Sequence, residues 1–309
     1  MVRTERDVTI DATAALLARV FPQAPRVSDS AYLRWLYEES PFGSVIEANL
    51  DDALGRAGHY ALVPIDLSVD GVPRAGALSL NTAVDERARG GGVFVQLATE
   101  AIDAAQRHGV QTVLGVANTN STPGFLRRLS FELVSPLPAT VLLPLPGRRH
   151  RVRSGWADDG ASVHDGTVAG LGRLLDPPAR GVARTWTPAA LRWRLSSPGA
   201  RYALHRSEHA LLVTTAERHK GVTVAVLLKT FSATRLGVAE RRALVRAACR
   251  LHRAPIALHV GINDTAPFRG APLPERLRPS PLNLIVRQLG AQPSVSSIAR
   301  FELLDFDAY

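Results

Sequence analysis

The sequence predicts an α+β protein of two domains with one shared layout, each a mixed, mostly antiparallel sheet flanked by helices. Its 309 residues suffice for two domains that each bury a core. Hydrophobic residues make up 46% of the chain, as in globular proteins rather than disordered ones. Segments of the first half recur in the second, so both domains are expected to follow the same plan.

The recurrence is clearest in two pairs of segments. AYLRWLYEESPFG at 31–43 aligns with AALRWRLSSPGA at 189–200, and VLGVANTNSTP at 113–123 aligns with ALHVGINDTAP at 257–267. A shared order of matched segments favours an internal duplication over chance. We therefore expect an N-terminal domain at 1–146, a basic, glycine-rich linker at 147–165 and a C-terminal domain at 166–309.

The N-terminal domain is expected to begin with two helices and a hairpin. The helices fall at 12–21 and 29–39, the second with Asp29 or Ser30 as its N-cap. Asp70-Gly71 is a strong hairpin turn between two β-like segments. The expected strands are at about 44–50, 59–69 and 72–83. Pro64 indicates an edge or a bulge in the middle one of these, because proline donates no N–H to a ladder.

A run of three glycines, Gly90 to Gly92, stands directly before an amphipathic helix. The apolar face of that helix consists of Phe94, Leu97, Ala98, Ile102 and Ala105. Glycine costs a helix roughly 0.5–1 kcal/mol relative to alanine, so the run does not serve helix formation. It is either a flexible loop or a place where a ligand approaches the backbone. The N–H groups and positive dipole end of a helix N-terminus suit a phosphate.

Three further elements complete this domain. They are a buried strand at 111–117, a short helix at 122–130 and one or two closing strands within 131–145. A hairpin, a glycine loop, a helix and a further strand in this order indicate helices packed on a mixed sheet.

Composition narrows the class of protein. The single cysteine, Cys249, excludes an internal disulfide and fits a reducing cytoplasm, and its helical neighbours indicate a small core residue. The net charge of +9 comes mostly from dispersed arginines rather than from a basic patch. Scattered histidines give no metal-binding spacing, so no metal is expected. The N-terminus lacks a signal-peptide core and no stretch reaches membrane-span length, so we expect a cytoplasmic protein without membrane contact.

Two motifs in the N-terminal half resemble those of the GCN5-related N-acetyltransferases (GNAT). The first is a strand ending at Val84, followed by Arg89-Gly90-Gly91-Gly92-Val93-Phe94 at the start of a helix. The second is a strand ending at Asn118, followed by Ser121 and by FLRRLSF at 125–131. The resemblance covers 72–135 well, and the element order extends it over most of 1–146. It implies a tandem GNAT protein with a degenerate second copy.

The resemblance implies acetyl-CoA, or another acyl-CoA, as co-substrate. Its pyrophosphate would lie on the glycine loop, and its pantetheine arm between the strand at 80–84 and the strand ending at Asn118. The expected cofactor-binding residues are Val84, Arg89, Gly90, Gly91, Gly92, Val93, Phe94, Asn118, Ser121 and Phe125. Asn118 and Ser121 have a structural alternative, which is to cap the following helix. The family often has tyrosine where this chain has Leu126, and glycine where it has Ser130.

An amine acceptor must lose a proton before it attacks a thioester, so a general base is needed. The candidates are Glu47, His59 and Asp66 on strands expected to face the cleft, together with Glu38 and Glu39 at the helix-to-strand corner. Each is alternatively a solvated side chain, and His59 a hydrogen-bonded strand-end histidine.

Three functions follow from the sequence. The first is an N-acyltransferase, in the simplest case an N-acetyltransferase, acting on a small-molecule amine. The second is a tRNA-dependent aminoacyl transferase of the same fold, favoured by the positive charge. The third is a non-catalytic acyl-CoA-binding protein, motivated by Leu126. In the second half only Arg235-Leu236-Gly237 remains of the loop, so we expect a copy that binds no CoA and covers or shapes the acceptor side, or only stabilises the fold.

Overall fold

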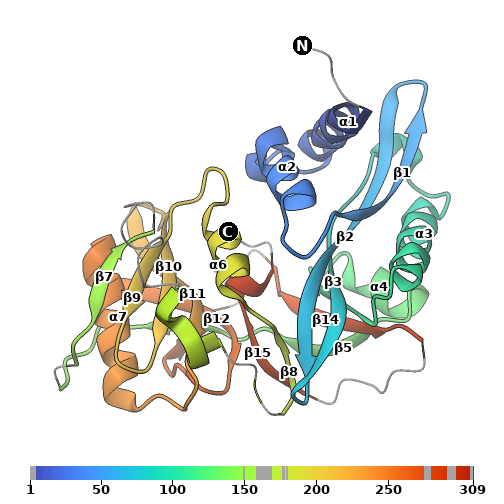
Figure 1. The fold of residues 1–309 in the computed structure, drawn as a ribbon. Helices are drawn as coiled ribbons and strands as arrows, with labels where there is room; N and C mark the ends of the chain where they lie inside the picture. The colour runs from blue at the N-terminus through green and yellow to red at the C-terminus, as the bar shows by residue number, and fades with distance from the viewer. Residues whose placement is uncertain are drawn as a thin grey trace.

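The computed structural model describes residues 5–148, 150–157, 169–175, 178, 180–274, 280–290, 297–306 and 309. It confirms the α+β class, with helices packed on long, mostly antiparallel sheets (Figure 1). Strands from both halves of the chain pair along one continuous path.

The first half contains the expected elements in the expected order. They are α1 (Glu5–Val20), α2 (Ser30–Glu38), β1 (Ile46–Asp52), β2 (Gly55–Val69), β3 (Val72–Val84), α3 (Val93–Arg107), β4 (Thr112–Ala117), α4 (Thr122–Arg128), β5 (Glu132–Pro136) and β6 (Ala139–Leu142). Asp29 is the N-cap of α2, because its side chain accepts the Tyr32 amide at 2.8 Å. Pro64 lies between the stretches of β2 that pair with β1 and with β8, so it occupies a local edge.

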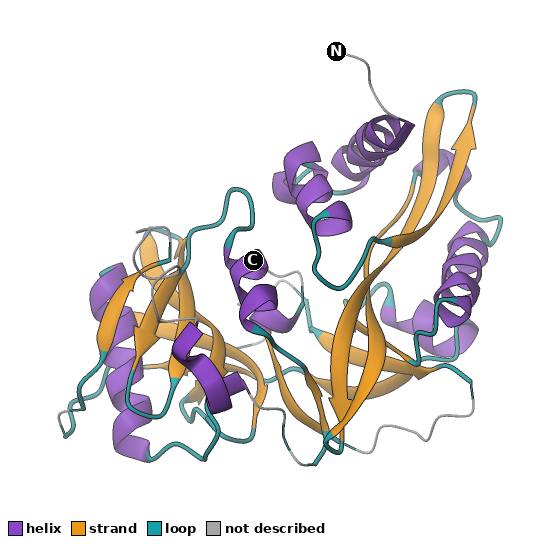
Figure 2. Ribbon diagram, in the orientation of Figure 1, coloured by secondary structure: helices purple, strands orange, loops and turns teal. Residues whose placement is uncertain are grey.

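The second half repeats the central part of this order. Its elements are β7 (Arg153–Trp156), β8 (Val182–Arg184), α6 (Pro188–Leu195), β9 (Ala203–Arg206), β10 (Leu211–His219), β11 (Val222–Phe231), α7 (Val238–His252), β12 (Ile256–Asn263), β13 (Ala271–Pro272), β14 (Asn283–Gln288) and β15 (Ile298–Glu302). The hairpin β2–β3, then α3, then β4 parallel to β3 corresponds to the hairpin β10–β11, then α7, then β12 parallel to β11 (Figure 2).

The two halves exchange strands. β14 lies between β4 and β5 of the first half, while β6 pairs with β12 and β13 of the second. The expected division into 1–146, 147–165 and 166–309 stays a prediction about the chain, and the sheet pairing crosses it. Within the expected linker, residues 149 and 158–165 lie outside the described residues.

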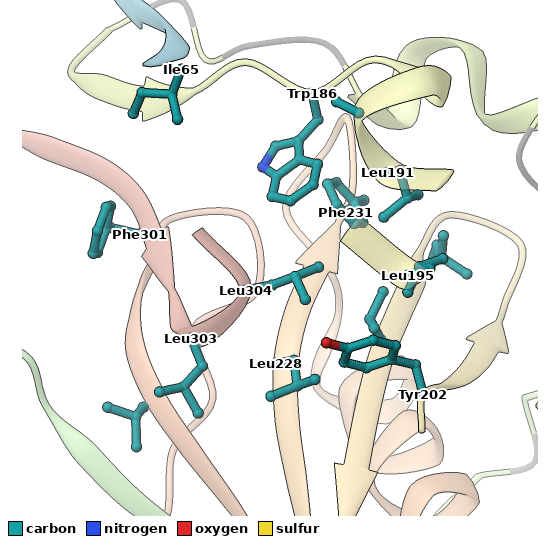
Figure 3. Packing of buried hydrophobic residues seen from close by; sticks show 14 of the residues in the cluster. Ile65, Trp186, Leu191, Leu195, Tyr202, Leu228, Phe231, Phe301, Leu303 and Leu304 are labelled. Atoms are coloured by element: carbon teal, nitrogen blue, oxygen red, sulfur yellow. The ribbon is translucent and has the colours of Figure 1, made fainter. Parts of the chain in front are cut away.

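Apolar packing joins the two halves as well. One cluster combines Ile65 and Leu78 of the first half with Leu228 and Phe301 of the second. Figure 3 shows Trp186 beside Phe231, and Leu303 and Leu304 belong to the same cluster. Cys249 is a buried core residue of α7, and burial raises the pKa of its thiol to about 11.

Candidate functional site

A V-shaped opening separates β3 from β4. The two parallel strands pair only where Gly76–Ser79 meets Thr112–Gly115, although β3 continues to Val84. Beyond this paired stretch the strands diverge and line a cleft of about 1690 Å³. The cleft is therefore open between the ends of two strands, where main-chain groups of β3 and β4 have no common ladder.

A β-bulge shapes the β3 side of this opening. Ala61 pairs with Leu80 and His59 with Ala83, so two residues of β3, Asn81 and Thr82, stand opposite a single residue of β2. Asn81 has a φ of +49°, in the left-handed region that asparagine tolerates better than most residues. The bulge places Asn81 in the lining of the cleft.

The glycine loop lies between Arg89 and Phe94, which both line the cleft. Gly90 and Gly92 have φ of +94° and +77°, so their conformation favours glycine. Gly91 has no such constraint, and a Cβ at any of the three would meet no atom within 4 Å. Packing therefore does not require the three glycines, and the space around them is open to a ligand.

The N-terminus of α3 begins directly after this loop. Gly92 is the N-cap without a side-chain hydrogen bond, and its carbonyl accepts the amides of Val95 and Gln96. The amides of Val93 and Phe94 therefore precede the helix ladder and point out of its end. The first turn contains no acidic residue, and Arg89 lines the cleft beside it. Free amides, a helix dipole and a guanidinium make this corner suited to an anion.

Asn118 caps the turn before α4, whereas Ser121 is the N-cap of the helix without a side-chain capping hydrogen bond. The Asn118 Oδ1 accepts the amides of Asn120 at 3.0 Å and Ser121 at 2.9 Å, while Ser121 Oγ accepts the Asn118 amide. Both residues also line the cleft, so capping and ligand contact are compatible. Phe125 is buried beneath them, with its ring 5.3 Å from Phe94. Ser130, where the family has glycine, has a φ of +53°.

The candidate bases lie away from the cleft wall. His59 is fully buried, and burial lowers its pKa to about 3. Asp66 is exposed opposite Ala75, towards the hairpin turn. Glu47 is 22% exposed on β1, with Oε2 3.6 Å from His59 Nδ1. None of the three is among the lining residues, and a catalytic role for them stays a prediction. β2 is buried on both faces from Arg56 to Val63, which encloses His59 and which the sequence pattern left open.

The two other acidic candidates, Glu38 and Glu39, lie at the end of α2 and its C-cap. Glu38 forms an ion pair with Arg34 at 3.9 Å, one turn earlier in the helix. Neither glutamate is among the lining residues of the cleft.

A buried hydrogen-bond chain connects His59 to the cleft. The Tyr37 hydroxyl lies 2.9 Å from His59 Nε2, and Asn81 Nδ2 donates to the same hydroxyl at 3.0 Å. His59 Nδ1 lies 2.7 Å from Asn49 Oδ1 and faces the Glu47 carboxylate, which can only accept. The sequence alone does not predict this hydrogen-bond chain, because its members come from α2, β1, β2 and β3.

The Glu47 carboxylate can only accept hydrogen bonds, and this sets the donor-to-acceptor order along the whole hydrogen-bond chain. It favours the proton on His59 Nδ1, so Nε2 accepts the Tyr37 hydroxyl proton. The Tyr37 oxygen then accepts from Asn81 Nδ2. The Oδ1 atom of Asn81 is consequently left to face the cleft, and it takes part in no hydrogen bond within the described part of the chain.

The corresponding opening in the second half is filled by protein. β11 and β12 pair over Val224–Leu227 and Ile256–His259, after which β12 pairs with β15. The Glu302 carboxylate of β15 accepts the Thr230 amide at 3.2 Å and Asn263 Nδ2 at 2.8 Å. A strand and a carboxylate of the chain itself therefore occupy this second V, whereas the first V is open.

Residues from the second half also line the first cleft. Glu217, His219 and Lys220 at the end of β10 contribute polar groups, and Tyr309 lies against Glu217. Burial raises the pKa of the Tyr309 phenol, and the nearby carboxylate raises it further. The sequence offered no specific signal for these residues, since their place depends on how the two halves meet.

The described residues contain no cluster of three or more histidine, cysteine or acidic side chains that could hold a metal ion. In the same part of the chain, no helix combines the length and the apolar character that a membrane crossing requires.

Comparisons with known proteins agree with this geometry. Residues 1–134 match the model of the acetyltransferase (GNAT) domain family. A probable N-acyltransferase of unknown function from Enterococcus faecalis V583 aligns with a TM-score of 0.64 at 13% identity, over 93% of this chain and 71% of that one. Among curated proteins, none matches the sequence.

Two further solved structures share the fold. Eis1 from Mycobacterium abscessus gives a TM-score of 0.56 at 13% identity, over 93% of this chain and 72% of its own. N-myristoyltransferase from Saccharomyces cerevisiae, solved with bound myristoyl-CoA, gives 0.60 at 10% identity, over 93% and 81%. The fold is thus that of the GNAT acyltransferases. Over residues 1–134 the chain is similar in sequence to the GNAT domain family.

Proposed function

We infer that this protein is an N-acyltransferase that moves an acetyl group from acetyl-CoA to a small-molecule amine. The observation that carries the proposal is the open V between β3 and β4, whose lining includes Arg89 and Phe94 on either side of the glycine loop, at the N-terminus of α3. The pyrophosphate would lie on the amides of Gly90 to Phe94 next to Arg89. The pantetheine arm would follow the diverging strands, where main-chain N–H groups can bind the thioester carbonyl.

The residues fit such a ligand on two counts. The space above Gly90, Gly91 and Gly92 is open, so a pyrophosphate can approach the backbone. In the second V, the carboxylate of a chain segment accepts an N–H of β11. The open V is therefore suited to a ligand group that also accepts main-chain N–H groups. Bound acetyl-CoA supplies an activated acyl group as a thioester.

The transfer balances without a further reactant. The neutral amine nitrogen attacks the thioester carbon, the C–N bond forms, the C–S bond breaks, and the amine proton passes to solvent or to a base while the thiolate leaves. A thiol with a pKa near 8.5 departs with little assistance, so Leu126 in place of tyrosine is compatible with the reaction. Among the expected bases, Glu47 is partly exposed and would act through a bridging water.

The test is thermal unfolding with and without acetyl-CoA for the parent, Gly91→Glu and Gly237→Glu. Gly237 is the N-cap of α7, also with open space around it, and is the matched control in the second half. Acetyl-CoA at 100 times its Kd stabilises by about 2.7 kcal/mol, which raises the Tm by roughly 5 °C for a chain of this size. We expect this shift in the parent and in Gly237→Glu, and its loss in Gly91→Glu.

The alternative functions give different results in the same assay. No shift in the parent contradicts the proposal, and salt-sensitive tRNA binding would then favour the aminoacyl-tRNA donor. A shift without release of CoA thiol on any amine would instead assign a non-catalytic acyl-CoA-binding protein.

A further inference from the structure

Much of the cleft lies beyond the V and faces the second half. Its volume of about 1690 Å³ exceeds the roughly 300–1,000 Å³ of ordinary ligand pockets. The wall beyond the V, which we call the far wall, is made by Val141 of β6, Val224 and Val226 of β11, Leu258 and Val260 of β12, and Phe306. Acetyl-CoA held at the glycine loop would not need this wall. The space in front of it is therefore available to the second reactant.

The far wall is a continuous apolar sheet face. Val226 pairs in register with Leu258, and Leu258 pairs with Val141, so the three side chains stand in a row on one face. The alternate residues Ala225 and Leu227 point to the opposite face, where they pack against α7. Because side chains alternate along these strands, one apolar face of the sheet packs against α7 and the other lines the cleft.

Charged groups are few along the described lining. Glu217 is the only carboxylate among the described lining residues, and it is already paired with the Tyr309 phenol. Arg89 and Lys220 are its cationic counterparts. An acceptor with several ammonium groups would need several carboxylates to offset its desolvation, so this lining does not favour a polycation.

Asn81 offers a polar acceptor on the β3 side of the V. Asn81 is fixed at the bulge by Tyr37, with its Oδ1 left for the cleft. A carboxamide oxygen accepts an N–H of an amine without demanding a full charge. A neutral acceptor in the same cleft as an extended apolar face defines the shape of the complementary ligand.

We propose that the acceptor is a primary amine on an elongated apolar body, with the amine at Asn81 and the body along the far wall. The inference rests on the proposed acetyl-CoA-dependent function and names its substrate class. An acyl chain longer than acetyl would have the same chemistry, and the experiment separates the two.

The experiment measures release of CoA thiol with two matched series. The first series gives acetyl-CoA with propylamine, hexylamine, decylamine and the polycation spermidine. The second gives propylamine with acetyl-, hexanoyl- and decanoyl-CoA. We expect kcat/KM to rise along the amine series by about threefold to fourfold for each methylene that the far wall covers. Spermidine should be used no better than propylamine.

A pair of valines on β11 provides the matched variants. Val224 lines the cleft, whereas Val222 on the same strand is 45% exposed and is not part of the lining. Val224→Asn should lower the decylamine-to-propylamine ratio of kcat/KM by about tenfold, and Val222→Asn should leave the ratio unchanged. Leu258→Asn is the second wall variant and should act as Val224→Asn does.

Each other result overturns the inference. A flat amine series, a preference for spermidine, or equal effects of Val222→Asn and Val224→Asn would exclude the far wall as the acceptor site. A length preference confined to the acyl-CoA series would assign the wall to the donor. Absence of an acetyl-CoA thermal shift in the parent would overturn the proposed function itself, and the inference with it.

Discussion

Trp35 and Trp193 stack on each other with their ring centroids 4.6 Å apart and their planes at 16°. The Trp35 indole N–H donates to the carbonyl of Trp193 at 3.2 Å, and the Trp193 indole N–H donates to the carbonyl of Trp35 at 3.3 Å. The two residues are the equivalent tryptophans of the repeated LRW segments, on α2 and α6. The duplicated motif therefore contacts its own copy in a reciprocal arrangement.

A double-mutant cycle on this pair tests the reciprocity. Trp35 is 2% exposed, so Trp35→Ala should lower the free energy of unfolding by about 3–5 kcal/mol. Trp193→Ala should cost less, because Trp193 is only half-buried. Since each variant removes the same stacking contact, the double variant should cost about 0.5–1.5 kcal/mol less than the sum. Urea unfolding measures all four proteins, and additive costs would contradict a direct contact.

The hydrogen-bond chain behind Asn81 predicts that a variant of Tyr37 changes the KM for the amine and not the KM for acetyl-CoA. Tyr37→Phe removes the hydroxyl that joins His59 to Asn81. We expect the KM for the amine to rise about tenfold, which corresponds to about 1.4 kcal/mol, while the KM for acetyl-CoA stays unchanged. The control is Tyr60→Phe, which removes another buried hydroxyl, bonded to Ser79 and not to Asn81. Equal changes in both constants would mean that Tyr37 only stabilises the fold.

Two buried histidines predict a loss of stability at acidic pH. Burial lowers the pKa of His59 and of His205 to about 3 each, below the value of about 6.5 in the unfolded chain. Below pH 6.5 the unfolded chain therefore binds protons that the folded chain does not. This contribution to stability is complete above pH 6.5 and falls as the pH drops towards 3. Each histidine should lower the free energy of unfolding by about 2 kcal/mol when the pH falls from 7.5 to 5.

Urea unfolding at these two pH values tests that prediction with His59→Gln and the exposed control His108→Gln. The difference between pH 7.5 and pH 5 should shrink by about 2 kcal/mol in His59→Gln and stay at the parent value in His108→Gln. An unchanged difference in His59→Gln would show that His59 is protonated in the folded protein.

A buried ion cluster holds Glu302 and Asp305 at the second V, the opening between β11 and β12. Lys229 Nζ lies 2.5 Å from Asp305 Oδ2 and 3.5 Å from Glu302 Oε2, and all three side chains are almost fully buried. Burial alone would raise the pKa of Glu302, but Lys229 and the His259 hydrogen bond hold it below its ordinary value. Lys229→Met leaves two buried carboxylates without their cation and should cost about 3–5 kcal/mol. Lys220→Met, at an exposed turn, is the control, and similar urea midpoints for both would contradict this role.

The sequence by itself determined the local features of this protein. Asp29 caps α2 and Asp70-Gly71 turns the hairpin, because such signals act over a few residues of backbone. The glycine loop before α3 was predicted for the same reason. The resemblance to GNAT proteins rested on these short segments, and the comparison over 1–134 agrees with it.

Only the tertiary structure decided what depends on distant pairing. The exchange of β6 and β14, the filling of the second V by β15 and the burial of His59 each bring together residues far apart in the chain. Every strand offers the same N–H and C=O groups, so the pattern of a strand gives its faces but does not name its partner. The sequence could therefore predict the glycine loop before α3, while the part of the cleft where the two halves meet followed only from the packed fold.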